Sequence, residues 1–157
     1  MDLFTDALVS NYTLSIPRED DWFGSLIGDW DICCYSKKKN SQWQMRGQWF
    51  FRRILDGSGV EDLLLCDAAK PKRSAALRLY DGENRCYTAV CTHGAAMFRL
   101  RFVKDGSRLI GTNMDKPNEL HVFSDIQKES FTWSRVMISE NKAWHEEYTI
   151  YASRMQK

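Results

Sequence analysis

From residue 28 to the end of the chain, turn-forming residues interrupt short β-rich runs about every 8 to 14 residues. Glycine supplies positive φ in such turns, and Asp or Asn bonds to nearby backbone amides. Turns this regular, without long helices between them, are typical of an antiparallel sandwich or barrel. The turn sequences are Asp56-Gly57-Ser58-Gly59, Asp81-Gly82, His93-Gly94, Asp105-Gly106 and Asp115-Lys116-Pro117-Asn118.

The runs between the turns predict roughly ten strands in up-and-down order. A closed barrel would remove the exposed edges that an open meander of this length leaves. We therefore expect an all-β protein, an up-and-down antiparallel β-barrel of about ten strands with a short N-terminal helix closing one end. The expected strands are 28–36, 42–54, 61–67, 75–81, 85–92, 97–104, 107–113, 119–125, 131–139 and 144–154, and the expected helices are 2–9 and 18–26.

Alternation of apolar and polar residues indicates one buried and one wet face along several strands. Phe98, Leu100 and Phe102 share one face, while Arg99 and Arg101 take the other. The same alternation sets an apolar series against polar neighbours in two further strands. These apolar series are Trp43, Met45, Gly47, Trp49 and Phe51 in one strand and Leu77 and Leu79, which alternate with Arg78 and Tyr80, in the other.

Composition excludes several classes of function. The 157 residues suit one domain, and a net charge of +1 leaves no basic stripe for nucleic acid. No run of about 18 apolar residues predicts a membrane-spanning helix, and the start of the chain lacks the pattern of a signal peptide. Five scattered cysteines support neither a disulfide framework nor a metal site. We expect a cytoplasmic protein.

The first 17 residues form a separate apolar segment before the domain of residues 18–157. It carries more apolar surface than a solvated tail requires, at Leu3, Phe4, Leu8, Tyr12, Leu14 and Ile16. The segment is expected either to fold over the barrel or to pack on another copy of the protein, which would make a homodimer.

Three features together resemble the calycin superfamily, which includes lipocalins, fatty-acid-binding proteins and nitrobindin-like haem barrels. The first is a helix-like turn at Asp21-Trp22-Phe23-Gly24; the second is Gly28-Asp29-Trp30 at the start of the first strand; the third is Arg154 on the last strand. The resemblance implies that Gly28, Trp30 and Arg154 close the barrel floor, with the arginine lying over the indole. It covers about residues 20–155 and extends to small uncharacterised bacterial barrels that share a Phe131-Thr132-Trp133 segment.

The resemblance also implies an interior that binds a small, largely apolar organic molecule. Barrels of eight to ten strands tend to have room for one small ligand, although their own side chains can also fill them. Haem is not expected, because His145 falls on the face opposite to Arg154 and the ligating pattern of the haem barrels is missing. No other cofactor and no metal is expected.

Three polar residues are predicted to face the interior. If Arg154 points to the floor, a period of two places Tyr148 and Glu146 on the same face. On the preceding strands Arg135 shares a face with Trp133, and His121 shares a face with Phe123. Neighbouring strands lie about 5 Å apart, so these side chains could converge. The predicted ligand-binding residues are His121, Arg135, Glu146, Trp133, Tyr148 and Trp49.

Such a cluster admits more than one function. It could anchor a ligand carboxylate or carbonyl, or Glu146 and His121 could act as a general acid–base pair in an isomerase or cyclase, with Arg135 holding an anion. A one-residue bulge near the barrel mouth would instead turn any of them to solvent. A third possibility is a filled, non-catalytic barrel that self-associates. No nucleophile motif and no phosphate loop occurs in the sequence.

Overall fold

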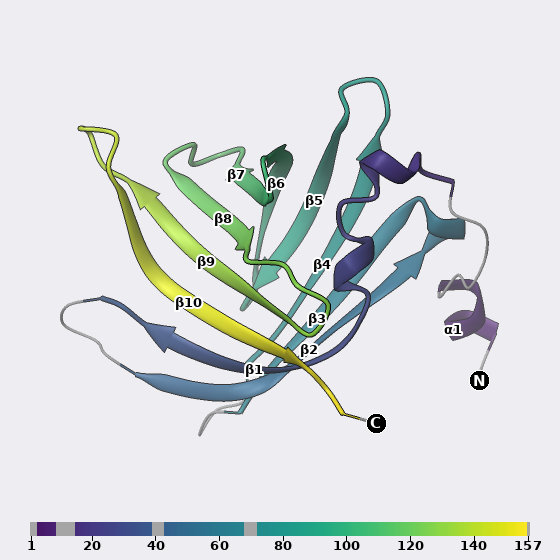
Figure 1. The fold of residues 1–157 in the computed structure, drawn as a ribbon, viewed down its shortest axis with the longest axis horizontal. Coiled ribbons are helices and arrows are strands. Elements are labelled where there is room, and N and C mark those ends of the chain that lie inside the picture. The colour runs from purple at the N-terminus through teal and green to yellow at the C-terminus, as the bar shows by residue number, and fades with distance from the viewer. Residues whose placement is uncertain (1–2, 9–14, 39–42, 68–71, 157) are drawn as a thin grey trace.

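The computed structural model describes residues 3–8, 15–38, 43–67 and 72–156, which form one closed antiparallel barrel of ten strands (Figure 1). Each strand pairs with its neighbours in sequence, and β1 pairs with β10 to close the barrel. The expected fold class is therefore confirmed. The strands are β1 (Gly28–Ser36), β2 (Gln44–Ile54), β3 (Gly59–Asp67), β4 (Lys72–Asp81), β5 (Cys86–His93), β6 (Ala96–Asp105), β7 (Arg108–Asn113), β8 (Glu119–Ser124), β9 (Ser130–Ile138) and β10 (Trp144–Arg154).

The segment before β1 is less helical than expected. Instead of one helix over 18–26 it contains two 3₁₀ turns, η1 (Arg18–Asp20) and η2 (Gly24–Leu26). A third turn, η3 (Leu55–Gly57), joins β2 to β3. Contacts with the barrel hold the chain between η1 and η2, because both carboxylate oxygens of Asp21 accept hydrogen bonds from Arg53 at 2.9 and 2.7 Å. Tertiary ion pairing thus replaces the helix that local sequence favoured.

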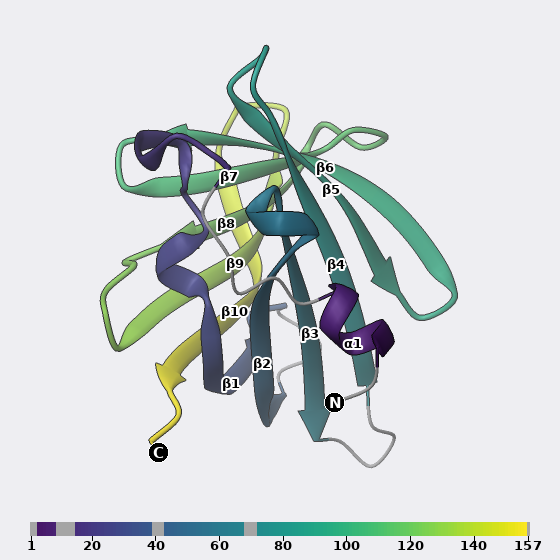
Figure 2. The same ribbon diagram turned by 90° about the vertical axis from the view of Figure 1, so that its right-hand side faces the viewer.

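This segment closes one end of the barrel with an aromatic plug. Phe23 is fully buried, and its ring meets Tyr87 and Phe102 edge-on with centroids 5.0 and 5.2 Å apart. Ile16 is buried in the same core. Figure 2 shows the purple and blue N-terminal segment crossing this end of the strands. The predicted closure of one end by a short N-terminal helical segment is therefore present, in the form of two 3₁₀ turns.

The predicted apolar segment of residues 1–17 is described only in part. The short helix α1 (Leu3–Leu8) leaves Leu3 and Phe4 exposed, and the rest of the segment up to residue 14 lies outside the described residues. Its pairing with a second copy stays a prediction. None of the described helices is long and apolar enough to cross a membrane.

The floor contact between the first and last strands is present as expected. Trp30 pairs with Arg154 in the ladder, and the guanidinium lies 4.1 Å from the centroid of the indole ring. Arg154 also donates hydrogen bonds to the carbonyls of Ile27 and Ser25, so it ties β10 to the N-terminal segment. Gly28 makes room for it: its φ is +131°, and a Cβ there would lie 2.5 Å from Nη1 of Arg154.

Candidate functional site

The inner face of the barrel changes character from the closed end to the opposite end, which we call the mouth. At the closed end large aromatic side chains fill the interior, and their exposed fractions are 0–2%. Towards the mouth, the wall formed by β1–β5 carries small side chains with exposed fractions of 4–8%. The closed-end residues are Trp30, Phe51, Tyr87, Phe102, Phe123 and Phe131. The small mouth residues are Cys34, Cys66, Ala76 and Cys91. Gly47 on β2 lies between the strands of Cys34 and Cys66.

Opposite the small residues, β8 and β9 carry a polar cluster centred on a buried carboxylate. Glu119 accepts hydrogen bonds from Asn113 Nδ2 at 2.8 Å and from Arg135 Nε and Nη2 at 3.0 and 2.5 Å. Nε2 of His121 lies 3.2 Å from Oε2, the oxygen that also accepts from Asn113, whereas Arg135 bonds to Oε1. We call these four residues the Glu119 cluster. It joins β7, β8 and β9, so no single strand reveals it.

The electrostatics of the Glu119 cluster favour an ionised glutamate beside a neutral histidine. Hydrogen bonds from His121, Asn113 and Arg135 hold the pKa of Glu119 well below its usual value, against the opposing effect of burial. Burial lowers the pKa of His121, and the nearby Arg135 and Arg78 lower it further, although Glu119 opposes this. The neutral imidazole therefore uses its Nε2 proton as the donor to Glu119.

The expectation that Glu146 faces the interior is wrong. A bulge in the pairing of β10 with β9 falls between Glu146 and Tyr148, so the alternation that holds from Arg154 to Tyr148 shifts by one residue. Glu146 is exposed and pairs with Lys37 at 2.7 Å on the outside. Glu147 takes a place near the mouth instead, and its Oε2 lies 3.2 Å from Nη1 of Arg135.

The remaining predicted ligand-binding residues lie on the inner face. His121 and Arg135 come together as expected, but around Glu119 rather than Glu146. Trp49 is buried in the middle of the barrel, and its ring is 6.1 Å from that of Trp133. Tyr148 is half-buried near the mouth and packs on Trp43. Their role in binding stays a prediction.

A second buried ion pair was not predicted. Arg78 on β4 pairs with Asp62 on β3, and Nε1 of Trp49 donates to the same carboxylate at 2.9 Å. The expected alternation of β4 is reversed, because Arg78 is buried whereas Leu79 is exposed. Asp62 on the neighbouring strand explains the reversal, since a buried arginine needs a buried partner. A sequence search for an acidic and a basic residue flanked by apolar residues on successive strands could have found it.

Aromatic rings surround the guanidinium of Arg78 on its other side. The rings of Phe23, Phe51, Phe102 and Phe123 have centroids 5.0–5.8 Å from it. Since Phe23 is the plug of the closed end, Arg78 belongs to the packing of that half. Its Nε is buried and makes no hydrogen bond within the described residues. The negative faces of the rings offset part of that cost.

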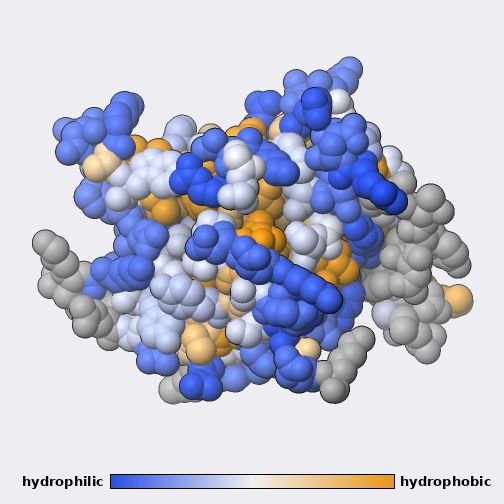
Figure 3. Space-filling view, viewed as in Figure 1, coloured by the Kyte–Doolittle hydropathy of each residue, from blue (hydrophilic) through white to orange (hydrophobic). Residues whose placement is uncertain are grey.

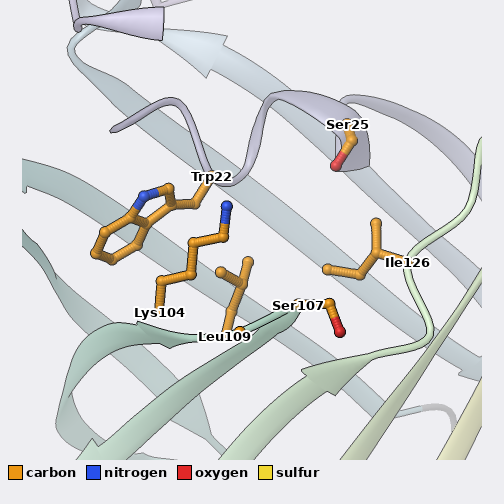
Figure 4. Close-up of a pocket in the computed structure, with 7 residues that line it drawn as sticks. Trp22, Ser25, Lys104, Ser107, Leu109 and Ile126 are labelled. Carbon is orange, nitrogen blue, oxygen red and sulfur yellow. The ribbon is translucent and has the colours of Figure 1, made fainter. Parts of the chain in front are cut away.

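Two hollows lie near the two ends of the barrel. One, of about 380 Å³, lies beside the closed end between η2 and the β6–β7 turn, where Figure 4 shows Trp22, Lys104, Leu109 and Ile126 around it. Hydrophobic atoms are also visible in the centre of the face drawn in Figure 3, framed by hydrophilic residues. The other hollow, of about 400 Å³, lies near the β7–β8 and β9–β10 turns. Neither contains the buried charged groups described above.

The described residues offer no obvious metal site. Within them, no group of three or more His, Cys, Asp or Glu side chains is arranged to hold an ion. The thiols of Cys34 and Cys66 come within 3.9 Å of each other across β2, where Gly47 has no side chain to separate them. All five cysteines are free thiols.

Comparison with known proteins identifies the fold but no family. The chain resembles the crystal structure of Rv2717c from M. tuberculosis with a TM-score of 0.61, at 11% sequence identity, over 90% of this chain and 100% of that one. No protein-family model matches the sequence, and no curated protein matches it either. The class that the structure defines is thus a ten-stranded antiparallel closed barrel, a fold that can bind ligands.

Proposed function

We propose that the mouth half of the barrel binds a small, largely apolar organic molecule. The observation that carries the proposal is the contrast across the inner face near the mouth. Small residues such as Cys34, Ala76 and Cys91 line one wall, and they keep some exposure although they point inward. Aromatic and polar residues, among them Trp133 and His121, line the opposite wall.

Such an asymmetric lining suits a ligand pocket better than a filled core. Apolar pockets with a few placed polar groups are the usual form of small-molecule sites. A core that served only stability would gain from a larger side chain than Ala76 at this position, as the closed half has with Phe102 and Phe123. Burying the Glu119 cluster costs free energy that an apolar lining would avoid, so a role in recognition accounts for it.

We further propose that the protein is a calycin-like barrel. The contact of Arg154 with Trp30, the plug formed before β1 and the up-and-down order of ten strands support this assignment. Binding inside the barrel is the function that the resemblance implies.

Titration with N-phenyl-1-naphthylamine, a neutral fluorescent probe of apolar sites, tests the binding proposal. Ala76→Trp adds a large side chain to the inner face, where the probe is proposed to bind, and should weaken its binding by about tenfold or more. Ala75→Trp places the same side chain on the outer face of the same strand and is the matched control. Equal weakening by both substitutions, or a wild-type protein that does not bind the probe, would contradict the proposal.

A second candidate function is an enzyme that uses the same pocket, for example an isomerase. The specific observation in its favour is the pairing of Glu119 with Nε2 of His121, which fixes the ring and its tautomer as an orienting carboxylate does for a general base. Under this alternative His121→Gln would abolish exchange of a substrate C–H proton with solvent deuterium while substrate still bound. Under the binding proposal, no exchange is catalysed by the wild-type protein.

A further inference from the structure

We propose that the ligand is a neutral molecule with a flat apolar body that donates one hydrogen bond, as a phenol does, to Nδ1 of His121. This inference rests on the proposed function and names its ligand class. It departs from the expectation that Arg135 anchors a ligand carboxylate.

Two of the inner-face cations among the described residues, Arg135 near the mouth and Arg78 in the closed half, already pair with protein carboxylates. Three contacts from Arg135 reach Glu119 and Glu147: Nε and Nη2 bond to Glu119, and Nη1 lies 3.2 Å from Glu147. Arg78 pairs with Asp62 and packs among the rings of the closed half. An anionic ligand would have to displace Glu147 and then lie close to Glu119. Charge therefore disfavours an anion in this pocket.

Within the Glu119 cluster, His121 keeps one ring nitrogen free. Its Nε2 is directed to Glu119, two residues nearer the mouth on the same strand. The two ring nitrogens lie on different edges of the imidazole, so Nδ1 points away from Glu119. Within the described part of the chain Nδ1 makes no hydrogen bond. Since Nε2 carries the proton, Nδ1 presents a lone pair and accepts only from a donor.

The surroundings of the imidazole define the rest of the ligand. The ring of His121 lies between Phe98 and Trp133, with centroids 5.4 and 5.3 Å away. These three rings come from β6, β8 and β9 and form one aromatic wall near the mouth. Aromatic surfaces favour offset-stacked or edge-to-face contact with a flat ligand. A flat molecule against this wall would place a hydroxyl within reach of Nδ1.

Calorimetric titration of the wild-type protein with three naphthalenes tests the inference. The probes are 2-naphthol, which is neutral and donates; 2-methoxynaphthalene, which cannot donate; and 2-naphthoate, which is an anion. We expect 2-naphthol to bind about tenfold more tightly than 2-methoxynaphthalene, since the ether leaves a buried acceptor unpaired. We expect 2-naphthoate to bind more weakly than both. This comparison needs no variant and so does not depend on the folding of one.

Two variants assign the preference to His121. His121→Phe keeps a ring between Phe98 and Trp133 but has no acceptor, so the ratio of the 2-naphthol and 2-methoxynaphthalene affinities should fall to about one. Binding of 2-methoxynaphthalene by this variant reports whether its pocket is intact. His145→Phe, on the exposed part of β10, is the matched control and should leave the ratio unchanged.

Each outcome bears on a different claim. If 2-naphthoate binds most tightly, or if the two neutral probes bind equally to wild-type protein, the ligand class is overturned while the proposed binding function stands. An unchanged ratio in His121→Phe overturns the role of His121. If none of the three probes binds, the proposed function itself fails, and the inference fails with it.

Discussion

The two halves of the barrel are built from the same ten strands but use their interiors differently. Aromatic rings, among them those of Trp30, Phe102 and Phe123, fill the closed half. This half also contains the buried ion pair between Arg78 and Asp62. The mouth half combines small side chains on β1–β5 with the Glu119 cluster on the other side.

If the mouth half binds a ligand as proposed, this difference separates stability from recognition along one set of strands. Burial of large rings stabilises the closed half, because each ring removes a large apolar area from water. The mouth half buries less apolar area, because it has small residues on one wall and an ionised glutamate on the opposite wall. The predictions below would break or sharpen the comparison, beginning with the largest expected effect.

Trp30→Ala should lower the free energy of unfolding by about 3–5 kcal/mol, because it leaves a cavity in the fully buried floor and removes the platform for Arg154. Trp43→Ala, at a half-buried mouth position, should cost about 1 kcal/mol. Urea unfolding followed by circular dichroism measures both. Equal losses would mean that the two halves contribute alike, against the comparison.

Arg78→Met should cost about 3 kcal/mol, since it leaves the carboxylate of Asp62 buried without its cation. The double variant Asp62→Asn/Arg78→Met should recover part of that loss, because the amide that replaces the carboxylate is neutral and can still accept from Trp49. A double-mutant cycle in urea gives the coupling. A purely additive result would show that the two side chains do not act as a pair.

Glu119→Gln should cost about 2 kcal/mol at pH 7, the order expected for losing charge-assisted hydrogen bonds. Because the pKa of Glu119 is lowered by its donors, its stabilising effect is complete above about pH 4.3, the usual value for glutamate, and is lost as the pH falls below that. The variant should therefore unfold with a weaker acid dependence than the wild type.

Glu146→Gln is the control for Glu119, because this carboxylate lies outside the barrel beside Lys37. Exposed ion pairs contribute little, so its loss should be under about 0.5 kcal/mol. A larger loss for Glu146→Gln than for Glu119→Gln would contradict the assignment of the two glutamates.

Stability should also decline as the pH falls below about 6.5, the usual value for histidine, because the pKa of His121 is lowered in the folded protein. In that pH range the imidazole of His121 is protonated in the unfolded chain but stays neutral in the folded protein, so protonation favours unfolding. Thermal melts of His121→Gln between pH 8 and pH 5 should be flatter than those of the wild type. His93→Gln, at the exposed end of β5, is the matched control for this change of slope.

Reducing agent should leave the unfolding midpoint unchanged, the smallest effect of the series. Cys34 and Cys66 lie on strands separated by β2, so their Cα atoms are about 9–10 Å apart, beyond the reach of a disulfide. Burial raises the pKa of Cys91 to about 11, so its alkylation at pH 8 should be slow. Labelling of all five thiols in the denatured, unreduced protein checks the first claim, and a count below five would contradict it.

Most of the barrel was predictable from the sequence because turns and alternation are local signals. The strand boundaries at Gly28–Ser36 and Trp144–Arg154 agree with the expected ranges, and the apolar series through Phe102 and through Trp49 point inward as predicted. The contact of Trp30 with Arg154 agrees with what the resemblance to calycin barrels implied. Each of these features depends on residues that are close in sequence or on the closure of the sheet itself.

Only the tertiary structure decided which charges are buried. A single bulge turned Glu146 outward, because a shift of one residue exchanges the two faces of a strand. Arg78 and Glu119 are buried because partners on other strands, Asp62 and Arg135, neutralise them. The sequence therefore determined the barrel and its apolar faces, whereas the charges at its centre depended on strand register and on partners that come together only when the barrel closes.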